Sequence, residues 1–198
     1  IIPGAHSRER SRSTSVAMFC AKHAAETLPA PSAIRVLETI RSAVPGKYYV
    51  EFYLGLVRLN SGDPETALPH FRAALDLNPD ASETASIYSY LGSACKDTGR
   101  FGDALDWLGK GIELDPERTD LHNLSGFCHF KRGEHAQAIT AFKRVIELDP
   151  SSAIDYANLG VNYQALGETK KAIHCFRLAL SLDAGIEFAR QHLARLEP

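Results

Sequence analysis

Residues 119–152 read TDLHNLSGFCHFKRGEHAQAITAFKRVIELDPSS, and residues 153–186 follow as AIDYANLGVNYQALGETKKAIHCFRLALSLDAGI. The two stretches agree when they are aligned at a spacing of 34 residues, which places Gly126 over Gly160. The pattern extends upstream, because Gly92 precedes Gly126 by 34 residues and Gly55 precedes Gly92 by 37. A fixed period of this length indicates an array of repeated supersecondary units.

Each unit carries further features at fixed offsets. An alanine and then a large apolar residue follow each of these glycines, at Ala67, Ala104, Ala138 and Ala172 and at Phe71, Leu108, Phe142 and Phe176. Small residues let two helices approach closely, so we expect the alanines to lie opposite the glycines across a helical hairpin. A second glycine series and a proline series are expected to end the first and second helices, respectively, at Gly62, Gly99, Gly133 and Gly167 and at Pro79, Pro116 and Pro150.

These residues resemble the tetratricopeptide repeat, whose 34-residue helix-turn-helix units stack into a right-handed superhelix. The resemblance implies an all-α solenoid with units at 48–81, 85–118, 119–152 and 153–186 and a three-residue insertion within residues 80–84. Run backward, the same register predicts a degenerate hairpin at 14–47, with prolines in its turn where the other units carry glycine. We expect residues 1–13 to be a linker or tail and residues 187–198 to form a C-terminal capping helix.

Composition narrows the possible partners. The formal net charge of −2 supplies no field that would gather nucleic acid, and groove lysines and arginines are scarce. No apolar run approaches the ~20 residues that a membrane span needs. Four cysteines are scattered singly, which is typical of reduced thiols. We therefore expect a cytoplasmic protein that binds neither nucleic acid nor membrane, and no sequence signal specifies its oligomeric state.

One cluster of possible metal ligands lies within the third unit. His122, Cys128, His129 and His135 are close in sequence, but His122 and His129 take register positions that hold tyrosine or cysteine in neighbouring units. We interpret them as packing residues, since strong zinc-ligand spacing is missing. No nucleophile or phosphate-binding motif is found either, so the sequence predicts no enzyme, no metal and no cofactor.

One predicted second helix contains two glycines, Gly109 and Gly111, although glycine destabilises a helix interior. Gly111 falls where Ala74 and Ala179 lie in sister units, a position of close helix contact. Gly109 aligns instead with basic residues such as Lys143 and is expected to be exposed.

The resemblance implies that first helices line a concave groove, which we expect to bind a peptide or protein segment. Its predicted lining has apolar and aromatic ends and a small polar middle, at Tyr49, Phe52, Leu56, Ser89, Ser93, Lys96, Asn123, Phe127, Phe130, Asn158 and Val161. Such a surface suits a segment that presents spaced hydrophobic anchors. An alternative is that the 14–47 hairpin or an upstream domain already covers Tyr49 and Phe52.

A second function remains open, that of an accessory domain of a larger enzyme. The chain starts without methionine, so we expect it to be part of a longer protein. Its opening, IIPGAH, is similar to the end of the YcaO-type ATP-dependent domain, some of whose members carry repeats of this kind at the C-terminus. Even then, the resemblance implies that catalysis lies outside this chain. A nucleic-acid reader built from helical repeats is disfavoured by the charge balance.

Overall fold

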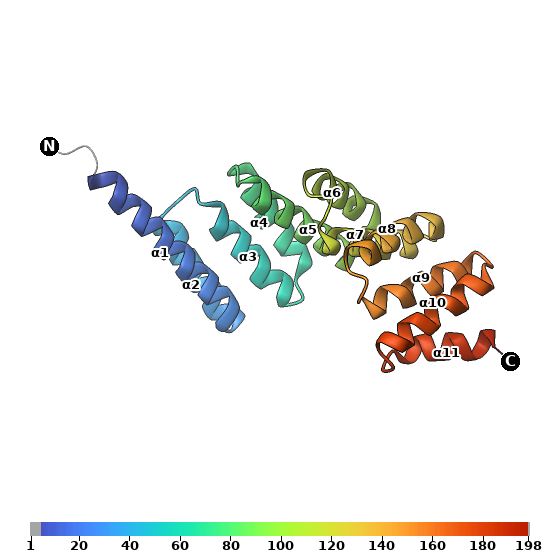
Figure 1. The fold of residues 1–198 in the computed structure, drawn as a ribbon. Helices are drawn as coiled ribbons and strands as arrows, with labels where there is room; N and C mark the ends of the chain where they lie inside the picture. Colours follow the sequence, from blue (N-terminus) through green and yellow to red (C-terminus); the bar gives the residue numbers. More distant parts are fainter. Residues whose placement is uncertain (1–4, 198) are drawn as a thin grey trace. The chain divides into compact units, whose positions relative to one another are not determined.

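A computed structural model describes the backbone of residues 5–197 and the side chains of residues 15–197. Within that range the chain forms eleven α-helices and no strand, which confirms the all-α prediction (Figure 1). The helices are α1 (Ala5–Thr27), α2 (Ala30–Ala43), α3 (Tyr48–Asn60), α4 (Pro64–Asp76), α5 (Ala81–Asp97), α6 (Phe101–Leu114), α7 (Thr119–Lys131), α8 (His135–Leu148), α9 (Ala153–Ala165), α10 (Thr169–Leu182) and α11 (Glu187–Leu196). They fall into two compact units, unit 1 at residues 1–98 and unit 2 at residues 99–198.

The turns inside the hairpins follow the glycine prediction. Gly62, Gly133 and Gly167 each end a first helix with φ between 74° and 77°, and Gly99 has φ 76°. This left-handed backbone is unfavourable for a residue that carries a Cβ atom. At the opposite end of a hairpin, Asn78 takes the same region with φ 53° after α4. The chain can therefore reverse within a few residues.

The first glycine series allows an aromatic ring to pack on bare backbone. A Cβ atom built on Gly55 would lie 2.8 Å from the Phe71 ring, and one on Gly160 would lie 2.7 Å from the Phe176 ring. Gly126 and Phe142 repeat this arrangement at 2.8 Å. The nearest neighbour of each glycine is thus the phenylalanine of the facing helix, whereas the sequence led us to expect the alanine.

Unit 1 begins with a hairpin that packs on the next helix. α1 and α2 contact each other, and both contact α3. Their shared core consists of Ala21, Ala33, Leu37, Tyr49, Val50, Tyr53, Leu54 and Val57. Pro29 precedes α2 and Pro31 lies in its first turn, where proline costs no helical hydrogen bond. Residues 5–13, for which a linker was expected, are helical and belong to α1, while residues 1–4 lie outside the described residues.

The insertion expected within residues 80–84 lengthens a helix. α5 has 17 residues, whereas α3, α7 and α9 have 13 each. Asp80 caps the longer helix by accepting a hydrogen bond from the Glu83 backbone N–H at 2.9 Å. The extra residues therefore form an additional helical turn with its own cap.

Unit 2 contains two complete hairpins and a closing helix. α7 packs against α8, and α9 packs against α10. α11 contacts α10 and α9, in the segment for which a capping helix was expected. The core of α8 to α11 includes Ala138, Phe142, Ala172, Phe176 and Ala189.

Candidate functional site

The predicted groove residues of unit 1 lie mostly against the protein core. Tyr49 is only 3% exposed, because α1 and α2 pack on α3 over this side chain. Phe52 and Leu56 are half-buried against the same core. Tyr49 therefore lies in a core shared with residues of the 14–47 segment, as the alternative reading of the sequence expected for this residue.

Phe52 is also held by aromatic neighbours. Its ring lies 5.3 Å from the Tyr53 ring, 5.3 Å from the Tyr90 ring and 6.0 Å from the Phe71 ring, measured between centroids. Edge-on and tilted pairs at these distances add to the free energy gained from burial. Phe52 is thus part of the packing among α3, α4 and α5.

The polar middle of the predicted groove lies on α5. Ser89 is 7% exposed and is therefore buried, whereas Ser93 is half-buried. The Lys96 ammonium lies 2.6 Å from the Asp97 carboxylate. Of these three residues, Ser89 does not reach the surface on which we expected it.

In unit 2, four of the predicted residues come together around one pocket. Phe127 and Phe130 of α7 line it with Asn158 and Val161 of α9. We call this the first-helix pocket; it has a volume of about 270 Å³, and its remaining walls are Phe142, Asn162, Phe188 and His192. Phe127 is 36% exposed. The pocket is therefore aromatic and apolar, with an amide edge from Asn158 and Asn162 and an imidazole from His192.

A buried carboxylate fixes one edge of this site. Asp155 in the first turn of α9 is 3% exposed and accepts hydrogen bonds from the Asn123 side chain at 2.6 Å, the Ser152 hydroxyl at 2.6 Å and the Asn158 side chain at 3.3 Å. Three donors compensate the cost of burying its charge. Asn123 thereby ties α7 to α9, whereas the Asn158 hydrogen bond lies within α9; both residues were predicted to line the groove.

The opposite edge is ordered by histidines. His135 donates through Nδ1 to the Asn162 amide oxygen at 2.9 Å, and the Asn162 amide nitrogen donates to the Asn158 carbonyl at 2.8 Å. His192 of α11 donates through Nδ1 to Gln164 at 2.6 Å and stacks on Phe176 at 5.4 Å. These hydrogen bonds hold Asn162 and His192 in fixed orientations at the pocket wall.

Sequence reasoning missed the contribution of α11 to the pocket. Phe188 and His192 are four residues apart, so they share one face of this helix. The apolar spacing of residues 187–198 predicted a covering helix. It did not predict which first helix that face would meet, because that depends on tertiary packing.

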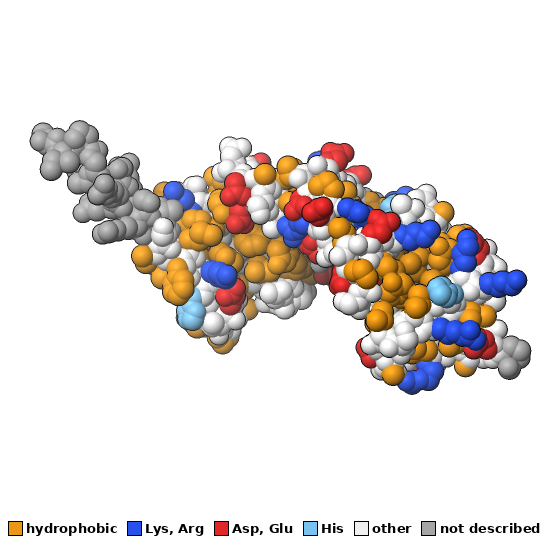
Figure 2. Space-filling model, in the orientation of Figure 1, with side chains coloured by type: hydrophobic (Ala, Val, Ile, Leu, Met, Phe, Trp, Pro, Cys, Tyr) orange, Lys and Arg blue, Asp and Glu red, His pale blue; other side chains and the backbone are white. Residues whose placement is uncertain are grey.

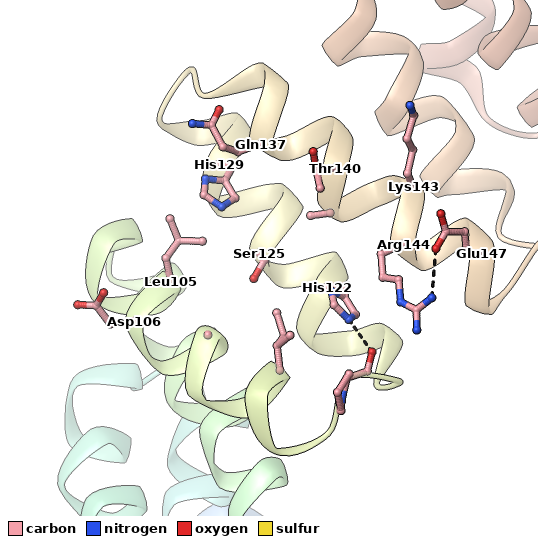
Figure 3. A pocket seen from close by; sticks show the side chains of 14 residues that line it. Leu105, Asp106, His122, Ser125, His129, Gln137, Thr140, Lys143, Arg144 and Glu147 are labelled. Atoms are coloured by element: carbon pink, nitrogen blue, oxygen red, sulfur yellow. Dashed lines mark hydrogen bonds and ion pairs between the residues drawn. The ribbon is translucent and has the colours of Figure 1, made fainter.

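The second helices of unit 2 border two further grooves. The α6–α8 groove (Figure 3) has a volume of about 850 Å³. Gly109, which lacks a side chain, is one of its lining residues. A Cβ atom at Gly109 would meet nothing within 4 Å, although the residue is half-buried where the register predicted exposure. Figure 3 shows Arg144 meeting Glu147 in the lining of this groove, while Lys143 extends away from that pair. The Arg144 guanidinium lies 3.1 Å from the Glu147 carboxylate.

The histidines considered as metal ligands have other partners. His122 donates through Nε2 to the Pro116 carbonyl at 2.9 Å, and His129 donates through Nδ1 to Glu134 at 2.7 Å. The hydrogen bonds from His129 and Arg132 lower the pKa of the Glu134 carboxyl. Among the residues that the structure describes, no three histidine, cysteine, aspartate or glutamate side chains are grouped to hold a metal ion.

Within the described part of the chain, no helix combines the length and the apolar character that a bilayer crossing requires. In unit 2, Figure 2 shows hydrophobic side chains gathered over α7 to α10, with lysines and arginines at the margins of the patch.

Comparison with known families gives matches along most of the repeat region. Three models described as tetratricopeptide or TPR repeats match residues 48–117, 126–167 and 156–185. None of these three is of the YcaO type, and Ile1 to Gly4 of the opening that suggested that link lie outside the described residues. No curated protein sequence matches the chain significantly.

Solved structures share the fold at low sequence identity. A MamA protein is 24% identical with a TM-score of 0.77, over 88% of this chain and 93% of that one. MamA residues 41 to the end from Desulfovibrio magneticus RS-1 are 17% identical with a TM-score of 0.78, over 87% of this chain and 96% of that one. YrrB, described as a TPR protein with an unusual peptide-binding site, is 19% identical with a TM-score of 0.77, over 89% of each chain.

Proposed function

The chain belongs to the tetratricopeptide-repeat family, and from this premise we propose that it is a protein-interaction scaffold that binds a peptide or protein segment in the first-helix pocket of unit 2. Proteins built from this repeat are typically non-catalytic scaffolds. The proposal accordingly gives the chain a role in recognition and no catalytic one.

One observation carries the proposal. Phe127, Phe130, Asn158 and Val161 come from two different first helices and line a single apolar pocket. A volume of about 270 Å³ suits one large side chain of a partner better than a whole small-molecule ligand, for which pockets usually exceed about 300 Å³. Partially exposed aromatic residues around a pocket are typical anchors of protein recognition.

The polar edge complements this anchor site. Asn158 uses its amide nitrogen for Asp155, and its amide oxygen has no partner among the described residues. A backbone N–H of a bound segment could donate to that oxygen. The peptide-binding site of YrrB, a protein of the same fold, is consistent with this use of the repeat.

The test is to select peptides that bind the full chain from a displayed library and to measure their affinity for the double variant Phe127→Ser/Phe130→Ser. We expect affinity to fall by about 2 kcal/mol or more, as for a true hot spot, with a largely unchanged thermal melt. The matched control is Ile154→Ser/Leu166→Ser, which removes two exposed apolar side chains of unit 2 that do not line the pocket.

Two outcomes contradict the proposal. Equal affinity of the double variant and the wild-type chain places the selected site elsewhere. Loss of the cooperative thermal unfolding transition in the double variant shows that these phenylalanines belong to the hydrophobic core. Val161→Trp then provides a second measurement, because it fills the pocket from α9 without removing either phenylalanine.

A further inference from the structure

A second groove in unit 2 lies on the side formed by the second helices. α8 and α10 form its walls and α9 forms its floor, and its volume is about 520 Å³. The lining is mainly apolar, with Ile146 from α8, Tyr156, Leu159 and Tyr163 from α9, and Leu178 from α10. We call it the α8–α10 groove; it shares no lining residue with the first-helix pocket.

The rim of this groove carries basic side chains. Lys143 extends from α8, and Lys170, Lys171 and His174 extend from α10. Lys171 is paired with Glu168 and lies 5.2 Å from the centre of the Tyr163 ring. Lys143, Lys170 and His174 have no ion-pair partner among the described residues.

Few carboxylates line the groove that could neutralise its lysines. Glu147 is the one carboxylate among the described lining residues, and it is 3.1 Å from the Arg144 guanidinium outside the groove. The neighbouring α6–α8 groove differs, because Asp106 lines it together with Lys143 and the Arg144–Glu147 pair. Of these two grooves, the α8–α10 groove is the one that combines a mainly apolar lining with an excess of lysines over carboxylates among the described lining residues.

Cys175 of α10 lies in the lining of the groove together with Lys143. Burial raises its pKa, while the positive charge of Lys143 acts in the opposite direction. Electrostatic attraction is stronger beside an apolar surface than in bulk water.

Lys170 and His174 are four residues apart on α10, so they face the same direction about one helical turn apart. Two carboxylates at the same spacing on a bound helix could approach both. We propose that the α8–α10 groove docks an acidic amphipathic segment of a partner protein, with large apolar side chains on the floor and glutamates or aspartates against Lys143, Lys170 and His174. This site lies apart from the first-helix pocket and does not depend on it.

The test uses the full chain and a short synthetic helical peptide in which leucines on one face are flanked by glutamates. A matched peptide carries glutamine in place of every glutamate. We expect the glutamate peptide to bind at least about tenfold more tightly at low salt, with the difference reduced at high salt. Amide chemical shifts should change at residues of α8 and α10 such as Ile146 and Leu178.

The matched protein variants reverse two charges each. Lys143→Glu/Lys170→Glu should weaken the glutamate peptide by about tenfold or more, because attraction becomes repulsion at both positions. Lys22→Glu/Arg195→Glu makes the same change in net charge at exposed positions outside the groove and should leave the affinity unchanged. Phe127→Ser/Phe130→Ser should also bind the glutamate peptide normally, which separates this site from the first-helix pocket.

Three results would overturn the proposal. One is equal binding of the glutamate and glutamine peptides, a comparison that needs no protein variant. Another is a set of shift changes confined to Phe127, Phe130 and their neighbours. A third is saturable binding of laurate in the groove with no binding of either peptide, which identifies a site for small anionic amphiphiles.

Discussion

Phe52 in unit 1 and Phe127 in unit 2 were both predicted to line a binding groove, and the structure gives them different surroundings. Phe52 is surrounded by the rings of Tyr53, Phe71 and Tyr90, on a helix that the α1–α2 hairpin covers. Phe127 is 36% exposed at the edge of a pocket. The repeat register thus fixes which helix carries a side chain, while the neighbouring helices decide whether it serves the core or the surface.

The largest effect should appear where the two units are alike. Phe71→Ala and Phe176→Ala should each lower the free energy of unfolding by about 3–5 kcal/mol, because each ring is fully buried against a glycine of the facing helix. Urea unfolding followed by circular dichroism measures both. A loss below about 1 kcal/mol in either variant would show that this contact does not hold its hairpin together.

One substitution in each unit tests whether Phe52 and Phe127 contribute differently to stability. Phe52→Ser should cost about 2–3 kcal/mol of stability, since it empties a space between aromatic rings. Phe127→Ser should cost less than about 1 kcal/mol, because much of that ring already contacts solvent. Equal losses in the two urea titrations would mean that the two phenylalanines have the same role.

Alkaline pH should weaken unit 1 through its tyrosines. Burial, with the nearby Glu83 and Asp80 carboxylates, raises the pKa of Tyr48 from 10.0 to about 12, and burial also raises the pKa of Tyr49 and Tyr53. Below pH 10 both states keep these phenols protonated and the full stability remains. As the pH rises from 10 to about 12, the unfolded chain ionises first, so the free energy of unfolding falls.

Thermal melts across that pH range measure the effect. The control variant is Tyr48→Phe/Tyr49→Phe/Tyr53→Phe, in which the decline should be smaller than in the wild-type chain. An equal decline in both proteins would assign the alkaline sensitivity to other groups.

The last comparison pairs two glycines of unit 2. Gly109→Ala should raise the free energy of unfolding by up to about 1 kcal/mol, because alanine favours the helix and its Cβ atom meets nothing within 4 Å. Gly160→Ala should instead lower it by about 1–3 kcal/mol, because the new Cβ atom would overlap the Phe176 ring. Destabilisation by Gly109→Ala would contradict the open environment of that position.

The sequence by itself determined the helical hairpins of this protein. Turn glycines such as Gly133 act within one hairpin, so their consequence can be read from spacing alone, whereas the packing of Phe142 on Gly126 replaced the alanine contact that the spacing led us to expect. The same register grouped Phe127 with Phe130 on one helix, but it predicted an exposed Gly109, which the structure has as half-buried with room for a Cβ atom.

Only the tertiary structure decided which of the predicted surfaces remain accessible. The burial of Tyr49 depends on where α1 and α2 pack, and the last wall of the first-helix pocket depends on which helix receives Phe188 and His192 of α11. The charged rim of the α8–α10 groove likewise requires α8 and α10 to lie on either side of α9. Such contacts join residues from separate hairpins, and their geometry follows from the packing of whole helices, which a local repeat pattern does not encode.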